Sequence, residues 1–155
     1  MTLPEPWGAA SRTGKNVYAR TKRHEEASRA VRVRDAMTET VLTFEPGRTL
    51  RDAARFMSDH TVGAVVIMDP EQPGPGILSE RDLVRSLGKG EDPDTELVSD
   101  HLTANAVFAD AEWDLGAAAD TMAKGGFRHL VVIDAGELTG IISMRDIMRV
   151  WRPAI

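Results

Sequence analysis

The chain of 155 residues lacks cysteine and has no apolar run near the ~20 residues that a membrane-spanning helix requires. Without cysteine, disulfides and thiolate metal sites are excluded, and the composition fits a reducing compartment, so we expect a cytoplasmic protein. Residues 1–30 also lack the basic region followed by an apolar stretch that a secretory signal needs. Positively charged residues are also fewer than negatively charged ones, which gives a net charge of −5. This charge repels phosphate backbones and argues against nucleic-acid binding.

An internal repeat is the strongest pattern that the sequence does contain. The segment GILSERD at residues 76–82 returns as GIISMRD at residues 140–146, and an offset of 65 aligns the preceding parts of both copies without a gap. The offset falls to 64 because the first copy has PEQPGP where the second has AGELT. Surface loops tolerate such length changes better than packed elements do, so the chain holds two copies of one fold.

Both copies predict the same order of elements: strand, helix, strand, strand and helix. Apolar residues spaced i, i+3, i+4 and i+7 from Leu50 predict the first helix, with Thr49 as its N-cap. Its counterpart begins after Asp114 and ends at the glycine pair 125–126. The predicted strands are 41–44, 64–69 and 76–78 in the first copy and 106–108, 130–134 and 140–142 in the second, and the predicted helices are 49–60, 80–87, 115–124 and 144–151.

These elements predict an α+β fold of two tandem β-α-β-β-α repeats. A unit this small buries only about 60% of its unfolded surface and is marginal alone. We therefore expect the repeats to pack through their sheets into one pseudo-twofold domain. The predicted boundaries are an N-terminal extension at 1–30, repeat 1 at 31–89, a linker at 90–95 and repeat 2 at 96–152. Residues 16–31 in and beside the extension fit either a packed helix or a solvated tail.

The repeated heptapeptide has a structural and a functional interpretation. Ser79 followed by Asp82 is a capping box, in which the two side chains satisfy N–H groups at the start of a helix. Capping does not require Gly76 before the serine or Arg81 between the capping residues. A helix start, a hydroxyl and a guanidinium suit a phosphate, while an aspartate suits a sugar diol. Glycine would let another group approach the backbone closely.

Four motifs, in the same order in both copies, resemble the CBS domain, the module named after cystathionine β-synthase. The first copy has DAMT at 35–38, TLRDAARFM at 49–57, VVIMD at 65–69 and GILSERD at 76–82. The second copy has DHLT, DLGAAADTM, LVVID and GIISMRD. The chain is therefore similar, over about residues 33–152, to a tandem CBS pair (Bateman module) of the small stand-alone bacterial type.

The resemblance implies nucleotide binding in clefts between the repeats. Ribose hydroxyls are assigned to Asp82 and Asp146, and phosphate or ribose contacts to Ser79, Ser143, Arg81 and Arg145. The opening segments, which hold the base in this family, match at Thr38, Val41, Thr103 and Ala106. Which opening segment serves which aspartate stays open.

The two clefts are expected to be unequal. Arg128 and His129 match basic residues that reach phosphate in this family, whereas the first copy has Gly63 and Ala64 at those positions. The resemblance therefore implies that the cleft lined by Arg128 binds polyphosphate better.

The resemblance implies a regulatory protein and not an enzyme. Its expected ligands are AMP, ADP, ATP or S-adenosylmethionine, with Mg²⁺ compatible with ATP, and it would act as a homodimer on a further protein partner. The resemblance implies neither a catalytic cofactor nor binding to a membrane. The histidines show no metal-binding spacing, so no metal site is predicted; they are His24, His60, His101 and His129. Two alternatives stay open: a ligand-silent dimeric scaffold, and nucleic-acid binding through the basic N-terminal segment.

Overall fold

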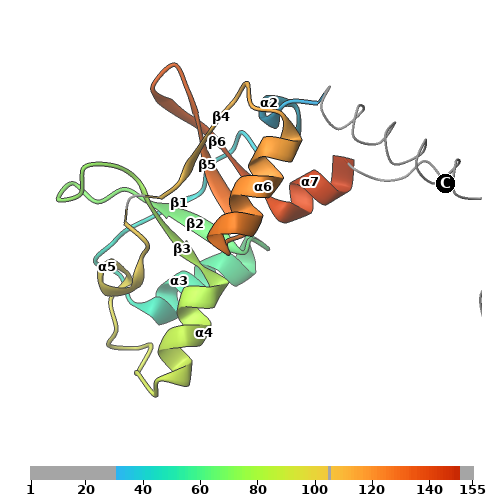
Figure 1. Cartoon of the computed structure of the whole chain (residues 1–155). Coiled ribbons are helices and arrows are strands. Elements are labelled where there is room, and N and C mark those ends of the chain that lie inside the picture. The colour runs from blue at the N-terminus through green and yellow to red at the C-terminus, as the bar shows by residue number, and fades with distance from the viewer. Residues whose placement is uncertain (1–30, 105, 151–155) are drawn as a thin grey trace, which may run out of the picture.

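The computed structural model describes residues 31–104 and 106–150, which form two three-stranded sheets with helices around them (Figure 1). Repeat 1 contains α2 (Val33–Ala36), β1 (Thr43–Phe44), α3 (Leu50–Asp59), β2 (Ala64–Ile67), β3 (Gly76–Ser79) and α4 (Glu80–Gly88). Repeat 2 contains α5 (Val98–His101), β4 (Phe108–Asp110), α6 (Leu115–Gly125), β5 (His129–Asp134), β6 (Glu137–Ser143) and α7 (Met144–Val150). The predicted α+β fold and element order are confirmed.

Both sheets have the same topology. In each, the first strand runs parallel to the second, and the second runs antiparallel to the third. The register also repeats, because Thr43 pairs with Val66 and Phe108 pairs with Val131. The opening strands start two residues later than predicted, at 43 and 108, because the residues before them face the space between the repeats.

The long helices begin and end as the sequence predicts. Thr49 Oγ1 accepts a hydrogen bond of 3.2 Å from the Asp52 amide, and Asp114 Oδ1 accepts one of 2.8 Å from the Ala117 amide. Gly126 ends α6 in the left-handed conformation, with φ of 70°. The Thr49 and Asp114 side chains satisfy amide groups that the first turn of a helix leaves without partners.

The short helices α2 and α5 are exchanged between the repeats. Val33 of α2 is fully buried in the core that contains α6, β5 and α7, and Val98 of α5 is fully buried in the core that contains α3, β2 and β3. Figure 1 shows α2 beside β4 and α6, and α5 near α3 and α4. Each repeat therefore completes its hydrophobic core with a residue from the start of the other.

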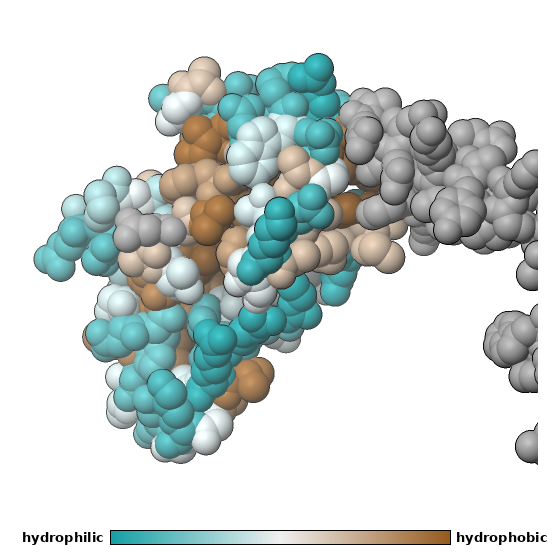
Figure 2. All heavy atoms as spheres, viewed as in Figure 1, coloured by the Kyte–Doolittle hydropathy of each residue, from teal (hydrophilic) through white to brown (hydrophobic). Residues whose placement is uncertain are grey.

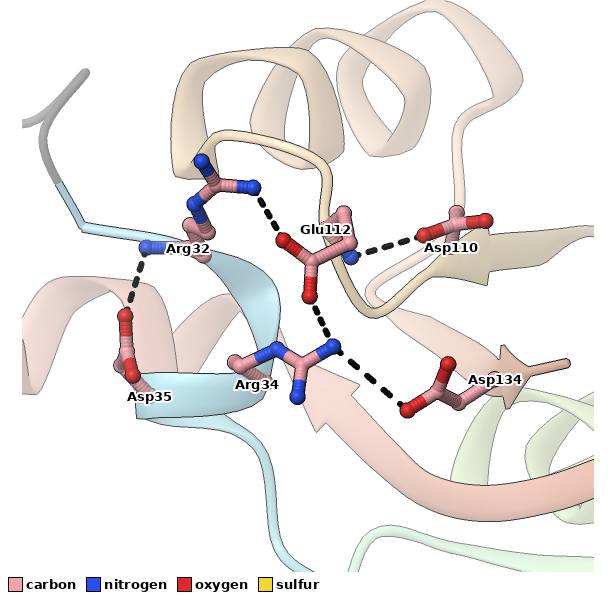
Figure 3. Close-up of polar contacts among 6 residues, drawn as sticks. All are labelled: Arg32, Arg34, Asp35, Asp110, Glu112 and Asp134. Carbon is pink, nitrogen blue, oxygen red and sulfur yellow. Dashed lines mark hydrogen bonds and ion pairs between the residues drawn. The ribbon is translucent and has the colours of Figure 1, made fainter.

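Polar contacts accompany this exchange on the α2 side. Figure 3 shows Arg32 and Arg34 both directed at Glu112, and Arg34 also directed at Asp134, 3.5 Å away. All four side chains are substantially exposed, and exposed ion pairs contribute about 0 to 1 kcal/mol. The burial of Val33 is therefore the stronger attachment.

The two sheets meet through a separate apolar cluster. Val66 of β2, Val131 of β5 and Ala106 are buried together, with Ile77 and Ile141 against them. Figure 2 shows hydrophobic residues gathered over the strands and hydrophilic ones over the turns. The predicted packing of the repeats through their sheets is confirmed.

Two further expectations concern the N-terminal segment and membrane-spanning helices. Residues 16–31, which fit either a packed helix or a solvated tail, lie outside the described residues except for the last of them. Within 31–104 and 106–150, no helix combines the length and hydrophobicity that crossing a bilayer demands.

Candidate ligand clefts between the repeats

The opening segment of each repeat is hydrogen-bonded to the third strand of the other. The Thr38 amide donates to the Ile141 carbonyl at 2.9 Å, and the Ile141 amide donates back at 3.0 Å. Thr103 and Ile77 form the matching pair, at 2.9 and 3.0 Å. These paired hydrogen bonds bring the residues that follow each opening segment toward the heptapeptide of the other repeat.

The glycine of the heptapeptide is what permits this approach. A Cβ atom on Gly140 would lie 2.9 Å from the Thr38 carbonyl oxygen, and one on Gly76 would lie 2.7 Å from Leu102 Cδ1. The prediction that the glycine allows a close backbone approach is confirmed. The approaching group is the opening segment of the other repeat.

The larger of two cavities, here called the Asp146 cleft, has a volume of about 570 Å³. Repeat 1 contributes its opening segment and the turn before β2, and repeat 2 contributes the starts of β5 and α7. Seven predicted site residues line it: Thr38, Val41, Arg128, His129, Ser143, Arg145 and Asp146.

The smaller cavity, here called the Asp82 cleft, has a volume of about 250 Å³ and the reverse composition. Repeat 2 contributes the opening segment, and repeat 1 contributes the start of α4. The predicted site residues that line it are Ser79, Arg81, Asp82, Thr103, Ala106, Arg128 and His129. Each opening segment thus meets the aspartate of the other repeat, and all twelve predicted site residues line at least one cleft.

The capping interpretation of the heptapeptide is correct in both copies. Asp82 Oδ2 accepts hydrogen bonds from the Ser79 amide at 2.8 Å and from the Ser79 hydroxyl at 3.1 Å. Asp146 Oδ2 accepts the same pair from Ser143, at 2.8 and 2.7 Å, and Asp146 is only 8% exposed. The caps hold each carboxylate at its cleft and engage one of its two oxygens.

Arg128 and His129 line both clefts, which corrects the expectation that Arg128 marks only one of them. They stand where β5 begins, so the start of this strand borders both cavities. Burial lowers the pKa of His129, and the Arg128 charge lowers it further, against smaller opposing effects of Glu80 and Asp146. At neutral pH we therefore expect an uncharged imidazole that can donate and accept one hydrogen bond each.

Arg81 makes a contact across the Asp82 cleft. Its guanidinium donates a hydrogen bond to the Gly126 carbonyl at the end of α6, so it links the two repeats. Among the described residues, Arg145 makes no matching hydrogen bond in the Asp146 cleft. The two arginines occupy equivalent sequence positions in different environments.

Three charged cleft residues were not predicted. Arg149 and Glu80 line the Asp146 cleft, and Arg85 lines the Asp82 cleft. Arg85 and Arg149 each follow their aspartate by three residues, so the repeated motif extends to S-x-R-D-x-x-R, and this signal was available in the sequence. Glu80 has no such signal, because its counterpart is Met144.

Comparison with known proteins decides the family. The model of the CBS domain matches residues 33–89 and again 98–152. The chain belongs to the CBS-domain family. Its two CBS domains form a tandem pair, as the sequence motifs predict. CBS domains are commonly regulatory modules, and some bind adenosine ligands.

Individual relatives show the same arrangement. The CBS domain-containing protein YhcV of Bacillus subtilis is 32% identical over 116 residues, which cover 74% of this chain and 81% of that protein. A CBS-domain protein of Agrobacterium tumefaciens superposes with a TM-score of 0.70 and 32% identity, covering 77% of this chain and 92% of its own. A CBS domain protein of Pyrobaculum aerophilum, solved in complex with AMP, superposes with a TM-score of 0.67 and 25% identity, covering 75% and 89%.

Proposed function

We propose that this CBS-domain pair is a regulatory sensor that binds an adenine nucleotide, AMP, ADP or ATP, or S-adenosylmethionine. One observation carries the proposal: each cleft combines the opening segment of one repeat with the helix start of the other, which bears serine, arginine and aspartate. Backbone and apolar atoms suit a purine, a carboxylate suits ribose hydroxyls, and a helix start with arginines suits phosphate.

The Asp146 cleft is the proposed primary site. Its volume of about 570 Å³ lies within the range of roughly 300 to 1,000 Å³ typical of small-molecule sites, whereas the Asp82 cleft, at about 250 Å³, lies below it. The base would lie against Thr40 and Val41, and the ribose would bind Asp146. The phosphates would face Arg128, Arg145 and Arg149, which line the same cavity.

The proposed mechanism is a shift between relative orientations of the two repeats. A ligand in either cleft contacts both repeats, so it stabilises the orientation in which both sets of contacts form. The size of the shift is limited by the difference in its affinity for the two orientations. The changed surface would then act on a separate protein partner, without any catalytic step.

We also propose that the protein forms a homodimer through α4 and α7. Val84 on α4 is 67% exposed, and its repeat counterpart Met148 on α7 is 60% exposed. Leu87 and Val150 extend the apolar surface of the same two helices. Light scattering after size exclusion should give a dimer mass that falls to a monomer mass in Val84→Glu/Met148→Glu. A dimer that persists in this variant would place the interface elsewhere.

Isothermal titration of nucleotide-free protein with AMP, ADP, ATP and S-adenosylmethionine tests the sensor function. We expect saturable binding of at least one of these ligands, with one tighter site per chain. If every titration is flat on folded protein, the two S-x-R-D motifs act as helix caps only. The caps are complete without a ligand, so that outcome would favour the ligand-silent scaffold.

A salt series separates the remaining alternative. Nucleic-acid binding through the N-terminal segment would weaken steeply with salt, because counterions are released from the phosphate backbone. We expect no such binding from a chain with a net charge of −5.

A further inference from the structure

Away from both clefts, a histidine and two glutamates converge where the repeats are joined. Glu91 follows α4, Glu96 precedes α5, and His101 is the last residue of α5. His101 Nε2 lies 2.6 Å from Glu96 Oε2 and 3.8 Å from Glu91 Oε2, and one ligand atom from each residue lies within 4.8 Å of the others. The side chains are 14% exposed for His101 and 31% for each glutamate.

The charges of this cluster are not balanced by protein cations. Over 31–104 and 106–150, no lysine or arginine makes an ion pair with Glu91 or Glu96. Nε2 of a histidine carries at most one hydrogen, so it can serve only one of two carboxylates well. Two partly buried carboxylates next to one imidazole nitrogen favour a cation between them.

We propose that Glu91, Glu96 and His101 form a binding site for a divalent transition-metal ion of the Zn²⁺ or Co²⁺ type. Imidazole nitrogen with two carboxylate oxygens suits these ions, whereas Mg²⁺ and Ca²⁺ prefer oxygen ligands alone. With bonds of about 2.1 Å, tetrahedral ligand atoms lie about 3.4 Å apart. The contacts of 2.6 and 3.8 Å lie on either side of that distance, so side-chain adjustments under about 1 Å would bring His101 Nε2 to ligand spacing from both carboxylates. Water would take the fourth position.

The surrounding structure supports the ligands. Ser86, which is almost fully buried, donates a hydrogen bond of 2.6 Å to Glu91 Oε2. The Leu50 amide donates to the Glu96 carbonyl at 2.9 Å, which anchors the linker to α3. Such outer contacts orient metal ligands and strengthen binding. A bound ion would hold the linker against α5, directly before the opening segment that supplies Thr103 to the Asp82 cleft.

Zinc titration of the full-length chain against a chromophoric chelator tests this proposal. We expect one Zn²⁺ per chain and binding weakened by at least about tenfold in His101→Ala and in Glu96→Gln. Glu96→Gln keeps a carbonyl oxygen for the imidazole, so the metal-free variant should melt near the wild-type temperature. His24→Ala and His60→Ala are matched controls and should bind Zn²⁺ as the wild type does. Zn²⁺ should also raise the wild-type melting temperature and leave that of His101→Ala unchanged.

Two results would overturn the proposal. If no zinc binds at one per chain, or if His101→Ala binds it as tightly as wild type, the cluster is a hydrogen-bonded histidine–glutamate pair only. A visible absorption spectrum of the Co²⁺-loaded protein gives an independent readout, since a tetrahedral site with a nitrogen ligand absorbs more strongly than hydrated Co²⁺. An unchanged hydrated-ion spectrum would count against the site in the same way.

Discussion

The Asp146 and Asp82 clefts are built from equivalent segments of the two repeats, yet they differ in volume by about a factor of two, 570 against 250 Å³. In the smaller cleft, Arg81 bridges to the Gly126 carbonyl, while Arg145 in the larger one makes no matching hydrogen bond among the described residues. The larger cleft contains Glu80, where the smaller one has no equivalent acid. The two repeats therefore share their helix caps and the hydrogen bonds between each opening segment and the third strand of the other repeat, but their clefts differ in shape.

The difference has a local origin. The positions that match Arg128 and His129 in repeat 1 are Gly63 and Ala64. A Cβ atom on Gly63 would lie 2.7 Å from Glu80 Oε1, so the missing side chain leaves room for Glu80. The volume and charge of each cleft thus depend on a few side chains at the strand starts.

Substituting the aspartates should separate the two clefts most clearly. Asp146→Asn should weaken the tighter nucleotide site by about ten- to a hundredfold, roughly 1.5 to 3 kcal/mol, since a charge-assisted hydrogen-bond pair is lost. Asp82→Asn should leave that site unchanged. Asparagine keeps an acceptor for the helix cap, so folding is preserved. Calorimetric titration with AMP measures both variants, and equal losses would contradict the ranking of the clefts.

The two motif glycines should respond unequally to alanine. Gly140→Ala should lower the free energy of unfolding by about 1 to 3 kcal/mol, because its Cβ would press on the Thr38 backbone carbonyl at 2.9 Å. A flexible side chain lies 2.7 Å from the added Cβ at both glycines, Leu102 at Gly76 and Met37 at Gly140. Gly76→Ala should cost less, because the nearest backbone atom there, the Thr103 carbonyl oxygen, is 3.2 Å away. Urea denaturation compares them. A Gly76→Ala variant that is the less stable of the two would refute this steric account.

Arg128, which lines both clefts, should contribute to phosphate binding. Arg128→Ala should weaken ATP binding about fivefold, near 1 kcal/mol, through loss of a charged donor to phosphate. Adenosine, which has no phosphate, should lose much less. Parallel titrations with ATP and adenosine provide the measurement. Equal effects on the two ligands would remove Arg128 from phosphate binding.

His129 should produce the smallest effect, a pH dependence of stability. Its pKa in the folded chain is lowered, chiefly by burial and then by Arg128. Below the ordinary imidazole value of about 6.5, the unfolded chain therefore takes up a proton that the folded chain resists, and stability falls as pH falls through that window. Thermal melts at about pH 8 and about pH 5.5 should show a larger drop for wild type than for His129→Gln. The same drop in both would assign the effect to other groups.

Much of the fold could be predicted because its signals are local. The helical spacing from Leu50, the cap at Thr49 and the left-handed turn at Gly126 each depend on neighbours within a few residues. The motif glycine also indicated a close approach, which Gly140 and Thr38 now show.

The exchange of α2 and α5 could not be predicted in this way. A helix of four residues has no apolar periodicity, and a single buried valine does not indicate which repeat buries it. The shared position of Arg128 and His129, and the unequal cavity volumes, follow from tertiary packing between the repeats. The convergence of Glu91, Glu96 and His101 could not be predicted, because these three residues meet through a linker turn, without a helical or zinc-finger spacing.

A crystal structure of the protein with AMP tests the central claim, that a nucleotide binds between the opening segment of one repeat and the aspartate of the other. We predict AMP in the Asp146 cleft, with ribose hydroxyls at the Asp146 carboxylate and the base against residues 40–42 of repeat 1. A nucleotide held by an opening segment and an aspartate of the same repeat, or one bound outside both clefts, would contradict the account.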